Sequence, residues 1–277
     1  MPVTRPIQSR NDVFQRYETL RRNREKRTHQ RLFFLEGVHP VEQAIAAGED
    51  FLSIAYAADR RLSGWAQDML RRANPAEVHP MPAALLAELS DRDDPCELIC
   101  LVRERTDGAD RVRQAVTRAA SPLLVICDRP ASPGNLGTIV RSADAFGANG
   151  VLLTGHSADF YDPQCIRASI GTIFHVPFLA LGSTEEAVAF LRGLPTRMRI
   201  VGTSAHGVAS LHEADFTGPT ALIVGNETFG MSKAWKEASD LLLRIPIYGA
   251  ASSLNVGSAA SICLYEIARQ RDFDGHR

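Results

Sequence analysis

Three short segments of the chain place glycines beside amide and charged side chains, a combination that suits a ligand site. The first begins at Asn135 and carries Arg141 six residues later. The second covers residues 225–230 and contains one carboxylate, and the third is the small-residue stretch 245–255. Taken singly, each has an ordinary structural explanation, such as a helix cap for Asn135 or a surface charge for Arg141.

The three segments share a position relative to apolar runs of the sequence. Each follows a short run that is typical of a buried strand in a parallel sheet. Because the carboxyl ends of parallel strands lie along one edge of a sheet, we expect the segments to meet there. Their convergence favours a ligand site over three separate structural explanations.

The residue types of these segments exclude several familiar sites. Residues 225–230 have the Gly-x4-Gly spacing of a phosphate loop, but Met231 follows where that loop requires Lys, and Glu227 would repel a phosphate. No Gly-x-Gly-x-x-Gly follows a strand, and neither His206 nor His212 lies on a recognisable nucleophile turn. Glycine-rich loops with one carboxylate and no lysine suit a cationic, amphiphilic ligand. S-adenosylmethionine fits that description.

The alternation of strand-like and helix-like runs predicts two α/β units that would position these segments. Residues 32–105 form the first, residues 106–120 are a partly helical connection, and residues 121–277 form the second, a doubly wound parallel sheet. The expected strands are 33–35, 52–57, a short one near Val78, 98–102, 123–126, 151–154, 174–178, 199–203, 221–224 and 241–245. The expected helices are 40–47, 62–73, 83–89, one carrying Leu136 to Phe146, 163–170, 184–191 and 232–238.

The stretch 245–255 leads into a last helix, for which Ser252 or Ser253 is the expected N-cap. Apolar residues lie on more than one side of this helix, which is typical of a buried helix. Small and hydroxylated residues at its start would let free backbone N–H groups face a ligand.

Positive charge is concentrated at the start of the chain. Residues 1–31 carry nine Lys and Arg against three acidic residues, although the whole chain has a net charge of −1. Arginine presents a planar fork that fits phosphate oxygens, so we predict a basic arm that contacts RNA. The side chains expected to do so are Arg10, Arg21, Arg22, Arg24, Lys26, Arg27 and Arg31.

Other features of the composition exclude further classes of protein. Five scattered cysteines suit reduced thiols and predict a cytoplasmic location. Cys96 and Cys100 have no paired His or Cys, so we predict no metal site. No apolar run is long enough to span a bilayer and no signal peptide begins the chain, so we predict no membrane association.

The sequence resembles a known family, the SpoU (TrmH) RNA 2′-O-ribose methyltransferases of the SPOUT class. Residues 32–105 are similar to the family's L30e-like RNA-binding domain, and the methyltransferase likeness spans about residues 123–271. The three signature motifs match Asn135-x-Gly137-x-x-x-Arg141, Val224-Gly-Asn-Glu227-x-x-Gly230 and Ile245-Pro-x-x-Gly249-x-x-x-Ser253-Leu-Asn255-Val.

The resemblance implies a trefoil-knotted α/β domain that works as a homodimer and binds S-adenosylmethionine in the knot. It also implies residue roles by motif position. The implied catalytic residues are Asn135, Arg141, Glu227, Ser253 and Asn255. The implied cofactor-binding residues are Thr203, Gly225, Asn226, Ile245, Ser253, Leu254 and Asn255.

The implied reaction is methylation of a ribose 2′-hydroxyl, with a nucleotide of 23S rRNA as the expected target. The family assigns proton removal to the arginine that matches Arg141, but a free guanidinium does not deprotonate. We therefore expect Arg141 to bind the substrate phosphate and the 2′-oxygen, and Glu227 to orient Arg141 or the loop. A tRNA target and a non-catalytic ribosome-assembly factor remain alternatives. The basic arm resembles that of an antibiotic-resistance member of the family, so both resistance and housekeeping roles stay open.

Overall fold

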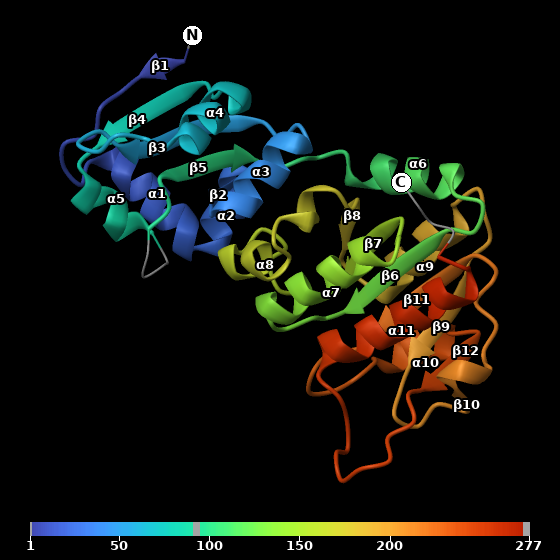
Figure 1. The fold of residues 1–277 in the computed structure, drawn as a ribbon. Coiled ribbons are helices and arrows are strands. Elements are labelled where there is room, and N and C mark those ends of the chain that lie inside the picture. Colours follow the sequence, from blue (N-terminus) through green and yellow to red (C-terminus); the bar gives the residue numbers. More distant parts are fainter. Residues whose placement is uncertain (1, 91–94, 274–277) are drawn as a thin grey trace. The chain divides into compact units, whose positions relative to one another are not determined.

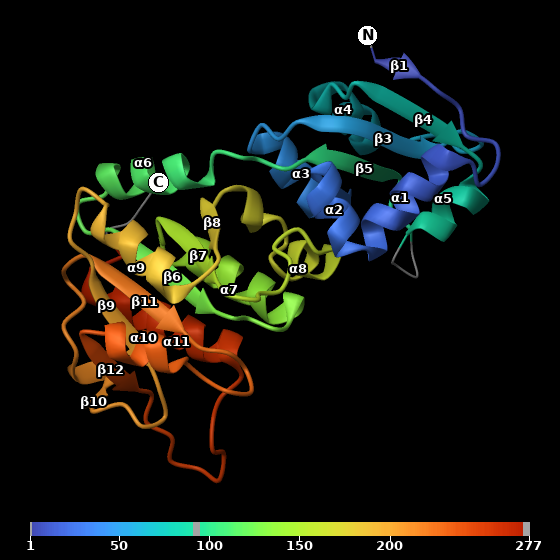
Figure 2. The ribbon, with the colours of Figure 1, turned by 180° about the vertical axis from the view of Figure 1, so that it is seen from behind.

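The computed structural model describes residues 2–90 and 95–273, and these residues form two compact units. The first unit combines residues up to Thr106 with Asp159–Phe174, and the second combines Asp107–Ala158 with the residues from His175 onward. Figures 1 and 2 show the chain from opposite sides. These boundaries differ from the predicted ones, because residues 1–31 are not a separate arm and residues 159–174 do not group with the second unit.

The first unit is built on a mixed sheet with the strand order β1-β4-β3-β5-β2. The β3–β4 and β1–β4 pairs are parallel, and β5 is antiparallel to both β2 and β3. Its strands are β1 (Val3–Thr4), β2 (Leu32–Glu36), β3 (Phe51–Ala57), β4 (Glu77–Met81) and β5 (Leu98–Arg103). Its helices are α1 (Asp12–Arg22), α2 (Arg24–Gln30), α3 (Val38–Ala46), α4 (Gly64–Ala73), α5 (Ala83–Leu89), α8 (Pro163–Ala168) and the short η1 (Thr172–Phe174).

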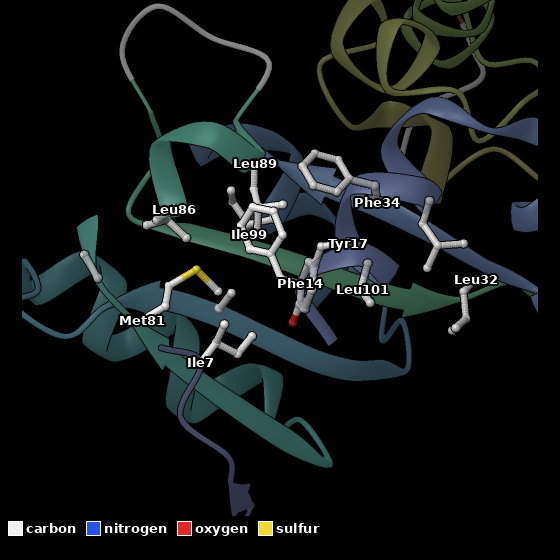
Figure 3. Close-up of a cluster of buried hydrophobic side chains, with 13 residues drawn as sticks. Ile7, Phe14, Tyr17, Leu32, Phe34, Met81, Leu86, Leu89, Ile99 and Leu101 are labelled. Carbon is white, nitrogen blue, oxygen red and sulfur yellow. The ribbon is translucent and has the colours of Figure 1, made fainter. Parts of the chain in front are cut away.

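The basic N-terminal segment is folded into the core of this unit. Phe14, Tyr17 and Leu20 of α1 are buried, and their spacing of three residues places them on one helix face. The Tyr17 hydroxyl shares a 2.7 Å hydrogen bond with the Ser53 hydroxyl of β3. Figure 3 shows Phe14 and Tyr17 among the buried side chains of the sheet. The segment therefore contributes to folding as well as to surface charge.

Residues 159–174 belong to the first unit through aromatic stacking and ion pairs. The ring of Phe33 stacks on Tyr161 and Phe174, with centroid distances of 4.4 and 5.8 Å. The buried guanidinium of Arg27 pairs with Asp159 at 2.7 Å and with Asp162 at 3.0 Å. A strand predicted over 174–178 is absent there, because 172–174 form a 3-10 turn and the strand begins at Phe178.

The second unit confirms the predicted doubly wound sheet, whose strand order is β10-β12-β9-β11-β6-β7-β8 with every pair parallel. Its strands are β6 (Leu123–Asp128), β7 (Gly150–Thr154), β8 (Phe178–Leu181), β9 (Arg199–Thr203), β10 (Ala209–Ser210), β11 (Thr220–Val224) and β12 (Leu241–Arg244). Its helices are α6 (Gly108–Arg118), α7 (Pro133–Ala145), α9 (Thr184–Arg192), η2 (Leu211–Glu213), α10 (Lys233–Ala238) and α11 (Val256–Gln270).

Helices cover both faces of this sheet. Side chains of α6, α9 and α10 form one buried cluster with alternate residues of β6 and β11. Helices α7 and α11 pack side by side on the opposite face (Figures 1 and 2). The N-cap of α11 is Asn255, not the predicted Ser252 or Ser253, because the Asn255 carboxamide oxygen accepts from Gly257 N and Ser258 N. Helix α11 is also less buried than predicted, since Ile262 and Tyr265 are exposed.

Candidate active site

The predicted convergence of the three segments is observed at one edge of the second sheet. Strand order places β12, β9, β11 and β6 next to one another, so their carboxyl ends lie in a row. The loop after β6 leads into α7, the loop after β11 holds Glu227, and the segment after β12 leads into α11. A chain of side-chain hydrogen bonds, Glu227 to Asn135 to Asn255, joins all three. We call these three residues the Glu227 cluster.

Glu227 binds the start of the first segment through both carboxylate oxygens. Oε2 accepts from Ala131 N at 3.0 Å, and Oε1 accepts from Ser132 N at 3.0 Å and from Asn135 Nδ2 at 3.1 Å. Burial would raise the pKa of Glu227, but these hydrogen bonds outweigh it and leave the pKa below its usual value. The side chain is therefore ionised at neutral pH and orients the loop before α7.

The two amide side chains of the cluster are oriented by this charge. Because an ionised carboxylate only accepts hydrogen bonds, Asn135 must present its NH2 group to Glu227. Its carboxamide oxygen then accepts from Asn255 Nδ2 at 3.1 Å. The oxygen of Asn255 is left to cap α11. Each amide thus has one consistent orientation, and the three segments are held in register.

Arg141 lies on α7, about 9 Å along the helix axis from Asn135 at a rise of 1.5 Å per residue. Its side chain is exposed and forms no hydrogen bond or ion pair with any residue that the structure describes. Glu227 does not orient it, so of the two roles expected for Glu227 the structure supports the one toward the loop. The guanidinium keeps its full set of donors for an external anion.

The residues predicted to bind the cofactor lie at neighbouring strand ends. Thr203 ends β9 and pairs in register with Leu243 of β12, and its hydroxyl donates to Ile223 O of β11 at 2.9 Å. Gly225 follows β11 directly, and Ile245 follows β12. A Cβ at Gly225 would lie 2.4 Å from Met231 N, so only glycine permits this close backbone approach. The result is a row of small residues and backbone groups at neighbouring strand ends.

Residues 226–230 form a tight hairpin that sequence reasoning did not foresee. Asn226 and Gly230 exchange both backbone hydrogen bonds, at 3.0 and 2.9 Å. The Asn226 oxygen accepts from Thr228 N and Phe229 N, and its NH2 group donates to Arg129 O at 2.7 Å. Both the side chain and the backbone hydrogen-bonding groups of Asn226 therefore organise the hairpin.

Asp128 and Arg129 are two site residues that the sequence analysis missed. Arg129 donates to the Asp128 carboxylate through Nε and Nη2, and Nη2 also donates to Gly230 O at 3.2 Å. The buried Asp128 carboxylate accepts from Ser232 N at 2.6 Å. Arg129 has a left-handed backbone with a φ of 51°. The Asp-Arg-Pro sequence after the apolar run 123–126 is the signal that could have indicated these hydrogen bonds.

In the segment between β12 and α11, Asn255 is hydrogen-bonded to the first motif segment, but other predicted site residues are exposed. Figure 1 shows it as a long loop that projects from the rest of the second unit. Ser253 is exposed and has no hydrogen-bond partner among the described residues, Leu254 is exposed, and Tyr248 is 97% exposed. Of the predicted catalytic residues, the structure thus brings Asn135, Glu227 and Asn255 together and leaves Arg141 and Ser253 unengaged.

Two of the seven cations predicted to bind RNA need correction. Arg27 is 1% exposed and donates to Leu20 O and Arg21 O besides its two ion pairs. Arg21 is also buried, and its guanidinium donates to three backbone carbonyls at residues 88–90. Both groups are structural, because they are buried and the hydrogen bonds that they donate lie inside the first unit. The other five are exposed: Arg10, Arg22, Arg24, Lys26 and Arg31.

Acidic and cysteine side chains give no sign of a metal centre. In residues 2–90 and 95–273, no group of three or more His, Cys, Asp or Glu side chains could hold a metal ion. Within the same ranges, no helix is long and apolar enough to cross a membrane.

Comparison with known proteins places this geometry in context. Residues 122–265 match the SpoU rRNA Methylase family, and residues 11–100 match the SpoU L30e-like domain. A 23S rRNA (uridine(2479)-2′-O)-methyltransferase of Streptomyces viridochromogenes is 41% identical over 98% of this chain and 94% of its own. A 23S rRNA (guanosine-2′-O-)-methyltransferase RlmB of Pseudomonas syringae pv. tomato is 30% identical over 92% of each chain. The crystal structure of the SpoU methyltransferase AviRb from S. viridochromogenes with the cofactor AdoMet superposes with a TM-score of 0.88, at 40% identity, over 96% of this chain and all of that one.

Proposed function

This chain belongs to the SpoU rRNA methylase family, and from that membership we propose that it transfers a methyl group from S-adenosylmethionine to a ribose 2′-hydroxyl of 23S rRNA. The relatives named above act on 23S rRNA, and AviRb binds AdoMet. One observation carries the proposal: the Glu227 cluster joins the three loops where the methyl donor and acceptor must meet.

The residues at the strand ends fit the methyl donor. When bound, S-adenosylmethionine supplies a methyl group on a positively charged sulfur. Thr203, Gly225 and Asn226 would hold it through the backbone edge described above, together with Ile245. Ser253, Leu254 and Asn255 would complete the pocket from the loop before α11. The carboxylate of Glu227 is already engaged by the loop before α7, so it would help to hold the loops in the geometry that an in-line approach of the acceptor oxygen needs.

Arg141 is proposed as the catalytic residue on the acceptor side. Its guanidinium stays protonated, so it does not act as the base. Its exposed, uncommitted donors would bind the RNA phosphate and the 2′-oxygen and stabilise negative charge as the hydroxyl passes its proton to the phosphate or to solvent. Glu227 and Asn135 are positioning residues, because their polar atoms bind one another and the loop.

The first unit is proposed to supply affinity for RNA. Its five exposed N-terminal cations would contact phosphates, and a 2′-O-methylating enzyme must reach a splayed, single-stranded nucleotide. Family membership leads us to propose further a trefoil knot in the second unit, a homodimer as the working form and a cytoplasmic location. The resistance role rests on the likeness to AviRb and is a proposal of the same kind.

The proposal is tested by incubating the protein with labelled S-adenosylmethionine and 23S rRNA, with tRNA as a parallel substrate. We expect label in 23S rRNA and one primer-extension stop at low nucleotide concentration, which marks a 2′-O-methyl group. Label confined to tRNA would move the target to tRNA. No label in either RNA, with the donor still bound, would favour a non-catalytic RNA-binding factor.

A further inference from the structure

The hairpin 226–230 carries a phenylalanine in an unusual environment. All twelve phenylalanines lie in the described part of the chain, and Phe229 is the most exposed of them, at 78% compared with 40% for the next, Phe273. An aromatic ring of this size normally contributes by burial. Phe229 gains nothing of that kind within the second unit, so its ring is available to a ligand.

The backbone that carries the ring is held in place. Phe229 N donates to the Asn226 carboxamide oxygen at 3.0 Å, and Asn226 and Gly230 close the hairpin with two backbone hydrogen bonds. Gly230 takes a φ of +63°, and its carbonyl oxygen accepts from Arg129 Nη2 at 3.2 Å. Little backbone entropy would therefore be lost when a partner covers the ring.

The hairpin that carries the ring is also tied to the acceptor side of the proposed site. Glu227, two residues before Phe229, binds Ala131 N, Ser132 N and Asn135 at the start of α7. Arg141, the proposed phosphate and 2′-oxygen ligand, lies on the same helix. The hydrogen bonds of Glu227 therefore tie the hairpin that carries Phe229 to the start of the helix that carries Arg141.

We infer that Phe229 is a positioning residue that stacks on a base of the substrate RNA, at or next to the methylated nucleotide. The inference rests on the proposed function and deepens it. A ribose whose 2′-hydroxyl enters a protein site must leave its helical stack, and an aromatic side chain replaces the lost stacking. Phenylalanine has no hydrogen-bonding group, so it would hold the base without reading its identity.

The test compares Phe229→Leu, which keeps an apolar side chain but cannot stack, with Phe229→Tyr, which can. Methyl transfer to 23S rRNA is measured at varied RNA concentration. We expect kcat/KM for RNA to fall about 10- to 100-fold in Phe229→Leu, as loss of one base–aromatic stack predicts, and to stay near wild type in Phe229→Tyr. Val208→Ala is the matched control, because Val208 is equally exposed on the same unit and is remote from the hairpin in sequence.

Two further measurements distinguish stacking on RNA from contact of the ring with the cofactor or with a partner subunit. Calorimetry with S-adenosylmethionine and light scattering should give the same donor affinity and the same mass for Phe229→Leu as for wild type. A weaker donor affinity would assign the ring to the cofactor, a lower mass would assign it to a partner subunit, and either would overturn the inference. Unchanged kcat/KM in Phe229→Leu would overturn it as well.

A binding readout distinguishes failure of this inference from failure of the proposed function. A single-stranded RNA oligonucleotide with 2-aminopurine loses fluorescence when that base stacks on an aromatic ring. We expect quenching by wild type and by Phe229→Tyr, and none by Phe229→Leu. Ring-dependent quenching without any methyl transfer would reject the methyltransferase proposal and keep the stacking role. Equal quenching by all three proteins would reject the stacking role.

Discussion

At the residue scale, the carboxylate of Glu227 and the guanidinium of Arg141 have opposite environments. Glu227 is engaged by two backbone N–H groups and by Asn135, whereas Arg141 has no partner among the residues that the structure describes. A group that is already engaged can fix geometry, and a group that is free can bind substrate. This difference supports the proposal that Glu227 is a positioning residue and that Arg141 contacts the substrate.

Arg141→Lys should lower kcat for methyl transfer by about 100-fold, the cost of losing one donor to a developing oxyanion. Lysine keeps the charge but loses the planar fork that can bind a phosphate and a 2′-oxygen together. The affinity for S-adenosylmethionine should stay near wild type, which calorimetry checks. Arg192 is an exposed arginine on α9, and Arg192→Lys is the control. In this variant both kcat and the affinity for S-adenosylmethionine should stay near wild type. Wild-type kcat in Arg141→Lys would reject the assigned role.

Glu227→Gln should lower the thermal transition of the second unit in a pH-dependent way. The pKa of Glu227 is lowered in the folded protein, so its stabilising effect is present above the ordinary carboxyl pKa of 4.5 and is lost as the pH falls through the folded value. At pH 7 we expect a difference from wild type of about 1 kcal/mol, or ~2–4 °C, because the group is exposed to solvent. Calorimetric scans at successively lower pH should show this difference shrink. A difference that does not decrease as the pH falls below 4.5 would contradict the assignment.

At the element scale, local patterns predicted the strands well but not the partners of charged side chains. The apolar runs at 123–126, 151–154 and 221–224 lie within observed strands, because burial on both faces needs only a short apolar sequence. Arg27 looked like an RNA ligand because its partners, Asp159 and Asp162, are more than 130 residues away. The cap of α11 was misplaced because Ser252, Ser253 and Asn255 can all cap a helix, and only the tertiary contact with Asn135 favours Asn255.

Arg27→Met should destabilise the first unit by about 3 kcal/mol, since removing one partner of a buried ion pair leaves unpaired charge behind. The variant would leave two carboxylates and two backbone carbonyls without their donor. Chemical denaturation followed by tryptophan fluorescence, with Trp65 on α4 as the probe in this unit, measures the change. Arg22→Met is the control, because the Arg22 pair with Glu18 is exposed, and it should cost less than about 0.5 kcal/mol. Equal effects of the two substitutions would refute a structural role for Arg27.

At the scale of the whole molecule, the proposed catalytic residues and the basic segment proposed to contact RNA phosphates belong to different units. The three motif segments all belong to the second unit, and the exposed N-terminal cations belong to the first. The predicted second unit, residues 121–277, included residues 159–174, whereas the structure groups these residues with the first unit. Phe33 stacks on Tyr161 and Phe174, and these contacts hold residues 159–174 in the first unit. The stacked residues are far apart in sequence, so no local pattern reveals the contact.

The proposed phosphate contacts of the basic segment predict a salt dependence of RNA binding that substitutions can reduce without changing the affinity for S-adenosylmethionine. Arg22→Gln with Lys26→Gln should weaken binding of 23S rRNA and reduce the slope of log K against log salt by about 1 to 2, since each lost phosphate contact in single strands contributes about 0.7. The affinity for S-adenosylmethionine should not change. Arg71→Gln with Arg72→Gln on α4 removes the same charge outside the predicted RNA surface. A slope reduced equally by both pairs would show a nonspecific charge effect and count against the basic segment.

The account depends most on the claim that the three segments form one binding site for the methyl donor. Titration calorimetry with S-adenosylmethionine tests it directly, on wild type and on Gly225→Ala, whose added Cβ would collide with the backbone at Met231. We predict one donor molecule bound per chain of wild type and at least tenfold weaker binding by Gly225→Ala. No heat of binding with folded wild type would contradict the account.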